Sequence, residues 1–147
     1  PNYPDITANA YLHTHAHQPA EATRIPIGPA PSKAVGDKQG IRRYGHFALA
    51  MDDAQIACAL DLSARPYLIC TLNFPTAKIG TFDTELVREF FQALATHGVI
   101  TLHIDLNHGL NSHHIAEAAF KSLAKSLRMA VEKDPRTDAL PSTKGAL

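Results

Sequence analysis

The alternation of hydrophobic and polar positions predicts three consecutive short strands after Gly40. Each is a short, largely apolar stretch bounded by polar residues. Asp52-Asp53 supplies the turn between the first two strands, and Ser63-Ala64 lies near the turn between the second and the third. The predicted strands cover residues 45–51, 56–62 and 66–73.

A helix is predicted after these strands. Asp83 can cap it, because a short carboxylate accepts hydrogen bonds from the free amides of a helix start. Gly98 closes it, since glycine commonly follows the last helical turn. The apolar residues between these positions recur at helical spacing and predict the buried face, namely Leu86, Val87, Phe90, Phe91 and Leu94.

A fourth strand over residues 99–106 and a longer second helix complete the pattern. Asn111 or Ser112 caps this helix, which runs to about Lys133, and Pro135 follows its end. The order is therefore three strands, a helix, a strand and a helix. It indicates an α+β fold, in which a mixed or antiparallel sheet carries its helices on one face.

Residues 1–36 are expected to be irregular, with one short strand around residues 5–14. Six of the ten prolines fall in this segment, and Pro26, Pro29 and Pro31 would break a helix through it. A single globular unit is therefore expected over residues 37–147.

Composition narrows the classes of function. The 147 residues suffice for one domain with a hydrophobic core, and the chain is 45% hydrophobic and 19% charged. Fourteen basic residues balance fourteen acidic ones, so no overall field favours nucleic acid or an anionic membrane. No apolar run has the length of a membrane span. Cys58 and Cys70 lie in apolar runs, which favours buried free thiols over a disulfide.

Nine histidines stand out, since imidazole is the commonest protein ligand for transition metals. The strongest pattern opens the second predicted helix, where His113 and Glu117 share one side and His114 and Lys121 lie on the neighbouring strip. Adjacent histidines point about 100° apart, so they reach two metal ions more easily than one. A solvated polar face fits equally well, because the apolar stripe lies elsewhere, at Ile115, Ala119, Leu123, Leu127 and Ala130.

The other candidate ligands carry weaker signals. His103 shares a strand face with Thr101 and Asp105, and a lone strand histidine is commonly structural. His108 lies in the loop before the second helix. Glu89 lies on the first helix away from its apolar stripe, which is typical of a solvent-facing charge.

Candidate anion-binding residues occur far apart in the sequence. Arg42 and Arg43 precede the first strand, Arg65 follows the second, and Ser142 and Lys144 lie near the end of the chain. Cationic side chains and hydroxyls are a suitable set for a phosphate. Taken separately, each is an ordinary surface group.

These motifs together run in the order and at the spacing of one family. Over residues 34–147 the chain resembles imidazoleglycerol-phosphate dehydratase, and the fit is specific to this family rather than to a fold. The segments that carry the resemblance are Gly36–Gly45, Met51-Asp52, Asp61–Tyr67, Thr101–Ile104, Asn111–Lys121 and Pro141–Leu147.

The resemblance implies a lyase of histidine biosynthesis that dehydrates imidazole glycerol phosphate to imidazole acetol phosphate. It implies two Mn²⁺ ions per active site that hold the substrate ring as an imidazolate, and a glutamate that moves protons. Glu21 and Glu117 are the implied catalytic residues. The implied metal ligands are His17, Glu21, Glu89, His113, His114 and Glu117, and the implied phosphate-binding residues are Arg43, Arg65, Lys121, Ser142 and Lys144.

The resemblance also implies a fold and an assembly. The family fold is a tandem repeat of two sheet-and-helix halves, so residues 37–147 should be the second repeat and residues 1–36 a remnant of the first. The subunits are expected to form a cubic 24-subunit homo-oligomer with active sites between subunits. The expected location is the cytoplasm, or the plastid in a plant, with no nucleic-acid or membrane partner.

The first metal motif departs from the family pattern His-His-x-x-Glu-Asp. His17 and Glu21 are kept, whereas Gln18 and Ala22 replace a histidine and an aspartate, and Pro19 would disturb a helix there. Three accounts fit: a truncated or misassigned chain, a degenerate relative without turnover, or a site with fewer ligands. The alternative function is therefore a non-catalytic metal-binding relative that keeps the fold and the assembly surface.

Overall fold

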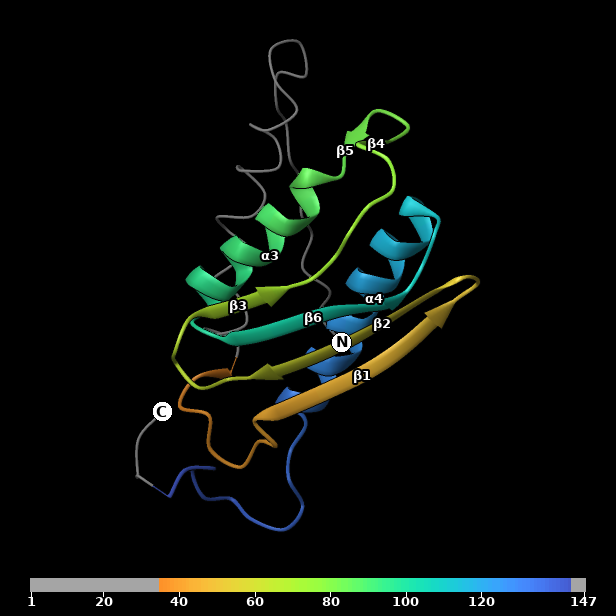
Figure 1. The fold of residues 1–147 in the computed structure, drawn as a ribbon. Helices are drawn as coiled ribbons and strands as arrows, with labels where there is room; N and C mark the ends of the chain where they lie inside the picture. Colours follow the sequence, from red (N-terminus) through yellow and green to blue (C-terminus); the bar gives the residue numbers. More distant parts are fainter. Residues whose placement is uncertain (1–34, 144–147) are drawn as a thin grey trace.

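The computed structural model describes residues 35–143, which form one sheet-and-helix layer with a small hairpin (Figure 1). The expected strand around residues 5–14 lies outside the described residues. The elements are β1 (Tyr44–Met51), β2 (Ala54–Asp61), β3 (Tyr67–Cys70), β4 (Lys78–Ile79), β5 (Phe82–Asp83), α3 (Glu85–Gly98), β6 (Thr101–His108) and α4 (Ser112–Val131).

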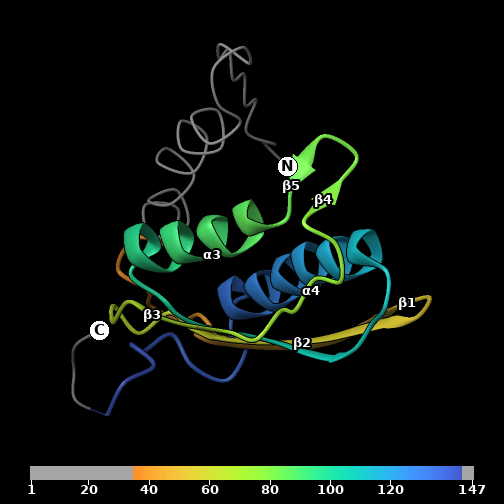
Figure 2. The same cartoon turned by 45° about the horizontal axis from the view of Figure 1, so that its top comes forward.

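The main sheet is mixed, with strand order β1-β2-β6-β3. β1 pairs antiparallel with β2, and β2 with β6, whereas β3 runs parallel to β6. Both helices cover the same face of this sheet, α4 over β1 and β2 and α3 over β3 (Figure 2). The predicted α+β class with a mixed sheet and helices on one face is therefore confirmed.

The core lies between the sheet and the two helices. Alternate residues of the central strands point into it, including Ile56 and Leu60 of β2 and Leu102 of β6. Between the helices, the ring of Phe120 packs against that of Phe91, with centroids 5.0 Å apart. The predicted apolar stripe of α4 is buried apart from Leu127, which is half-buried.

The close contact of α4 with β1 depends on a glycine. A Cβ on Gly45 would lie 1.8 Å from the carbonyl oxygen of Ser126, a distance no side chain tolerates. The buried hydroxyl of Ser126 in turn donates to the carbonyl of Cys58 at 3.2 Å. These contacts fix how α4 lies along the sheet and therefore where its first turn falls.

The start of α3 differs from the sequence prediction. Thr84 occupies the N-cap position and its side chain makes no cap hydrogen bond, so the predicted cap at Asp83 is wrong. Asp83 belongs instead to a β4–β5 hairpin that the sequence did not predict, and it pairs with Lys78 Nζ at 2.9 Å. Thr84 Oγ1 donates to the carbonyl of Ala77, so the hairpin holds the helix start in place of a cap.

Three other boundaries also shift. Gly98 is the last helical residue of α3, and Val99 takes the left-handed conformation after it, with φ of 53°. β3 covers residues 67–70 rather than 66–73, because its parallel pairing with β6 ends at Cys70. β6 begins at Thr101 and extends through His108, so His108 lies at a strand end rather than in a loop.

Cys58 is buried, Cys70 is half-buried, and both are free thiols, as predicted. Neither helix within residues 35–143 has the length and apolar character needed to cross a bilayer.

Candidate active site

The start of α4 carries three of the six predicted metal ligands, His113, His114 and Glu117. Asn111 caps the helix, and its side-chain oxygen accepts hydrogen bonds from the backbone amides of His113 and His114. One turn separates His113 from Glu117, and His113 Nε2 lies 3.1 Å from Glu117 Oε2. Lys121, one turn further, places its Nζ 2.6 Å from the other oxygen of Glu117. The structure therefore brings His113, Glu117 and Lys121 together.

His114 faces the β1–β2 turn instead. Its Nδ1 lies 2.5 Å from Asp53 Oδ1, and its Nε2 lies 3.5 Å from Asp52 Oδ2. The second oxygen of Asp53 accepts the backbone N–H groups of Leu110 at 2.5 Å and Asn111 at 2.9 Å. Asp53 thus ties the turn both to the helix start and to the His114 ring.

These contacts set the charge of the cluster. Hydrogen bonding to Lys121 lowers the pKa of Glu117 below its ordinary value, so Glu117 is a carboxylate at neutral pH. Hydrogen bonds from His114 and from two backbone amides hold the pKa of Asp53 well below its usual range. The same contact raises the pKa of His114. The helix start therefore offers ionised carboxylates beside imidazoles, which is a donor set suited to a divalent transition metal.

Two imidazoles and a carboxylate fit a metal by their chemistry, but they do not complete a site by themselves. Within residues 35–143, no three His, Cys, Asp or Glu side chains lie close enough to hold one ion. Glu89 is half-buried near the start of α3 and joins no such group within this range. His17 and Glu21, the other predicted ligands, lie outside the described residues.

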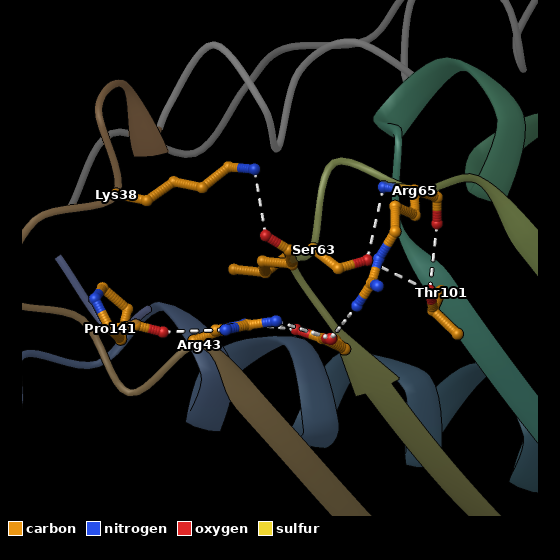
Figure 3. Close-up of polar contacts among 8 residues, drawn as sticks. Lys38, Arg43, Ser63, Arg65, Thr101 and Pro141 are labelled. Atoms are coloured by element: carbon orange, nitrogen blue, oxygen red, sulfur yellow. Dashed lines mark hydrogen bonds and ion pairs between the residues drawn. The ribbon is translucent and has the colours of Figure 1, made fainter. Parts of the chain in front are cut away.

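A second cluster surrounds Arg43 (Figure 3). It lies where β1 begins and β2 ends, at the end of these strands opposite the β1–β2 turn. Its guanidinium donates to both carboxylate oxygens of Asp61, from Nε at 2.6 Å and from Nη2 at 3.0 Å, and to the carbonyl of Pro141 at 2.8 Å. The side chains of Arg43 and Asp61 are only 10% and 17% exposed. Hydrogen bonding to Asp61 raises the pKa of Arg43. Arg43 is thus a buried connection between the end of β2 and the C-terminal segment.

The backbone of Arg43 is held as firmly as its side chain. Its φ is 68°, a left-handed conformation that a side chain disfavours. Its N–H donates to the carbonyl of Ala130 at 2.9 Å, and its carbonyl accepts the N–H of Leu62 at 3.2 Å. These bonds compensate the strain and fix Arg43 against α4 and the end of β2.

Two further cations lie beside this pair. Arg65 Nη2 lies 3.8 Å from Asp61 Oδ2, and its side chain is 72% exposed. The backbone of Arg65 is held by Ser63 and Thr101, whose hydroxyls also meet each other at 3.1 Å (Figure 3). Lys38 Nζ donates to the carbonyl of Leu62 at 2.9 Å. Burial and the nearby Arg43 lower the pKa of Lys38.

The predicted phosphate-binding residues divide between the two clusters. Arg43 and Arg65 meet at Asp61, and Ser142 follows the Pro141 carbonyl that Arg43 contacts. Lys121 lies with Glu117 instead. Since Arg43 meets α4 at Ala130, thirteen residues beyond Glu117, about 20 Å of helix separates the clusters. Lys144 lies outside the described residues.

Sequence reasoning missed Lys38, Asp53 and Asp61. Asp61 lies within a segment that carries the family resemblance, and Asp53 lies in the predicted turn, but neither position suggested a partner. Both contacts join segments far apart in the chain, since 61 residues separate Asp53 from His114. The predicted face shared by Thr101, His103 and Asp105 is confirmed, and all three are half-buried on the side of the sheet away from the helices.

Comparison with known proteins adds independent evidence. The family model described as imidazoleglycerol-phosphate dehydratase matches residues 4–127. The dehydratase of Cereibacter sphaeroides is 69% identical over 137 residues, which are 92% of this chain and 70% of that protein. That of Roseobacter denitrificans is 67% identical over 143 residues, or 97% of this chain and 73% of its relative.

Solved structures of the same family are also similar to this chain. The Staphylococcus aureus dehydratase superposes with a TM-score of 0.78 at 39% identity, covering 80% of this chain and 69% of its own. The Pyrococcus furiosus enzyme gives the same TM-score at 37% identity, covering 89% and 71%.

The α+β layer carries an imidazole–carboxylate cluster at a helix start, a donor set that suits a metal-dependent enzyme. The sequence and structure matches, which cover most of the chain, then identify the family. The chain belongs to the imidazoleglycerol-phosphate dehydratase family, the lyases that dehydrate imidazole glycerol phosphate in histidine biosynthesis.

Proposed function

We propose that this chain removes water from imidazole glycerol phosphate to give imidazole acetol phosphate, with two Mn²⁺ ions per active site. The observation that carries the proposal is the first turn of α4, where His113, His114 and Glu117 combine imidazoles with an ionised carboxylate in a chain of this family. The reaction removes a carbon-bound hydrogen as a proton and a neighbouring hydroxyl group, which together leave as one water.

Metal binding and proton transfer are assigned to named side chains in this proposal. His113, His114 and Glu117 hold metal, together with His17, Glu21 and Glu89, and Glu117 and Glu21 serve as the proton-moving carboxylates. When bound, manganese supplies Lewis acidity, which makes the substrate imidazole more acidic. The lowered pKa of Glu117 keeps it deprotonated, which is the form that a metal ligand needs.

The phosphate group of the substrate is bound in this proposal by Arg43, Arg65, Lys121, Ser142 and Lys144. Arg65 has the exposed guanidinium, and Arg43 still has N–H groups beyond those that meet Asp61 and Pro141. Charge-assisted bonds to phosphate oxygens then hold the substrate while its ring lies at the metal cluster.

We further propose that the active site forms between subunits of a homo-oligomer, a cubic assembly of 24 copies. The distance between the two clusters supports this arrangement. A three-carbon chain with bonds of about 1.5 Å spans well under 10 Å between the ring and the phosphate. It cannot bridge about 20 Å of helix within one copy, so one copy contributes the metal cluster and another the arginine cluster.

Residues 37–147 correspond in this proposal to the second repeat of the family fold, and residues 1–36 to a remnant of the first. The support is the layer itself, because residues 35–143 already contain a four-stranded sheet, its covering helices and a shared core. Gln18 and Ala22 in the first metal motif favour the alternative, a non-catalytic metal-binding relative that keeps the same fold.

Turnover by the purified, Mn²⁺-loaded chain tests the proposal. Formation of imidazole acetol phosphate is expected, and Glu117→Gln should slow it by about 10²–10⁴-fold. Glu132→Gln is the matched control, since Glu132 caps the end of the same helix and its side chain pairs with exposed Arg42 and Arg128 within residues 35–143. A folded, metal-loaded sample without turnover would favour the non-catalytic relative. A monomer by light scattering would contradict the shared site.

A further inference from the structure

The His114 side chain has a partner for each ring nitrogen, and the two partners differ. Nδ1 meets Asp53, whereas Nε2 points toward the exposed carboxylate of Asp52. Ionised Asp53 has no hydrogen to donate, so a neutral His114 must carry its proton on Nδ1. The lone pair of Nε2 is then the one available for a metal.

The orientation of the Asp53 carboxylate is itself fixed by backbone hydrogen bonds. Its Oδ2 accepts two backbone N–H groups, from Leu110 and Asn111, so the carboxylate cannot rotate away without breaking both bonds. These donors belong to the loop and cap that precede α4, the helix that carries His114. One carboxylate therefore sets both the place of the helix start and the orientation of the ring.

We propose that Asp53 is a positioning residue for metal binding: it holds the Nδ1–H tautomer of His114 and aims Nε2 at the ion. Metal-bound histidines commonly donate their second N–H to a carboxylate, which fixes the tautomer and makes the ring a better ligand. The inference rests on the proposed metal site. It goes beyond that proposal because Asp53 is not one of the proposed metal ligands or substrate-binding residues and acts through His114.

Asp53→Asn separates positioning from simple anchoring. The side-chain oxygen of the asparagine must still face the two backbone donors, so its NH₂ group faces His114 Nδ1. That contact requires an unprotonated Nδ1 and puts the ring proton on Nε2, the nitrogen meant for the metal. The helix start keeps its backbone hydrogen bonds while the ring takes the wrong tautomer.

The measurement is Mn²⁺ affinity of the purified full chain, by calorimetry and by the electron paramagnetic resonance of free Mn²⁺. Asp53→Asn should weaken binding by about 10–100-fold, and Asp53→Glu, which keeps a carboxylate, should recover part of the loss. Asn111→Ala is the matched control, because it removes the helix cap without touching the ring. It should lower the melting temperature of the metal-free protein more than Asp53→Asn does, and weaken Mn²⁺ binding less.

Three outcomes overturn the inference. Affinity of Asp53→Asn within about twofold of the unsubstituted chain removes the positioning role. Equal losses in Asn111→Ala and Asp53→Asn assign the effect to the helix start alone. If Asp53→Asn does not fold, a folded Asp53→Glu without any Mn²⁺ affinity overturns it as well. His114→Ala separates the two proposals, since unchanged affinity there refutes the metal site itself.

Discussion

Replacing Asp61 with asparagine should destabilise the fold, although Asp61 lies at the surface end of a strand. The substitution keeps the size of the side chain and removes its charge, which leaves the Arg43 guanidinium without a counter-ion. Arg43 is 10% exposed and cannot turn to water, because its backbone and its Nη1 are both hydrogen-bonded. A buried cation that loses its partner is costly.

The expected loss in free energy of unfolding follows from the burial of the Arg43–Asp61 pair. Removing one partner of a fully buried pair costs about 3–5 kcal/mol, and the amide oxygen of asparagine still accepts one hydrogen bond, so about 2–3 kcal/mol is expected here. For a chain of this size that corresponds to a fall in melting temperature of roughly 4–12 °C. Circular dichroism at one fixed protein concentration measures it, since assembly also shifts the melting temperature.

Arg65→Ala is the control for this prediction. Arg65 also pairs with Asp61, but at 3.8 Å and with a side chain 72% exposed. An exposed ion pair contributes under about 1 kcal/mol, so its removal should lower the melting temperature by no more than about 4 °C. If Asp61→Asn melts no lower than Arg65→Ala, the idea that burial makes the Arg43 pair important is wrong.

Three further predictions test separate parts of the fold. Gly45→Ala should not yield folded protein, because its Cβ would meet the Ser126 carbonyl at 1.8 Å; soluble yield with a native circular dichroism spectrum would contradict this. Burial raises the pKa of the Cys58 thiol to about 11, so iodoacetamide at pH 8 should modify it only after the protein is denatured, as peptide mass spectrometry would show. Hydrogen bonding to Arg136 lowers the pKa of Asp134 to about 2. Because the folded value lies below the unfolded one, this stabilisation is present above about pH 4 and is lost as the pH falls through about 2; Arg136→Ala should return the NMR titration midpoint of Asp134 toward its ordinary value.

Local periodicity was enough to predict most of the fold. The Asp52-Asp53 turn lies between two strands of eight residues each, so it implied the β1–β2 hairpin. The helical spacing of His113 and Glu117 placed both on one side of α4, where they lie 3.1 Å apart. Such features depend on neighbours within a few residues, which the sequence displays directly.

Contacts between distant segments could not be predicted in this way. The parallel pairing of β3 with β6 and the hairpin that precedes α3 depend on packing against the rest of the layer. The helix start at Thr84 shows the consequence, since the hairpin displaced the cap that propensity favoured at Asp83. Asp53 and Asp61 likewise acquire partners only when the sheet brings separate segments together.

In the proposed phosphate site, the local charges supply the positive field that the overall neutral chain lacks. Three cations lie there, Lys38, Arg43 and Arg65, against one carboxylate, Asp61, so three minus one leaves a net charge of +2. A phosphate monoester carries about −1.5 to −2 at neutral pH, which this excess matches. Asp61 neutralises Arg43, so exposed Arg65 and half-buried Lys38 supply the remaining positive charge. The lowered pKa of Lys38, caused by burial and by Arg43, is what an anion at this place would reverse. Arg43 therefore contributes its remaining N–H groups to the proposed site, while Arg65 and Lys38 contribute the positive charge that Asp61 does not neutralise.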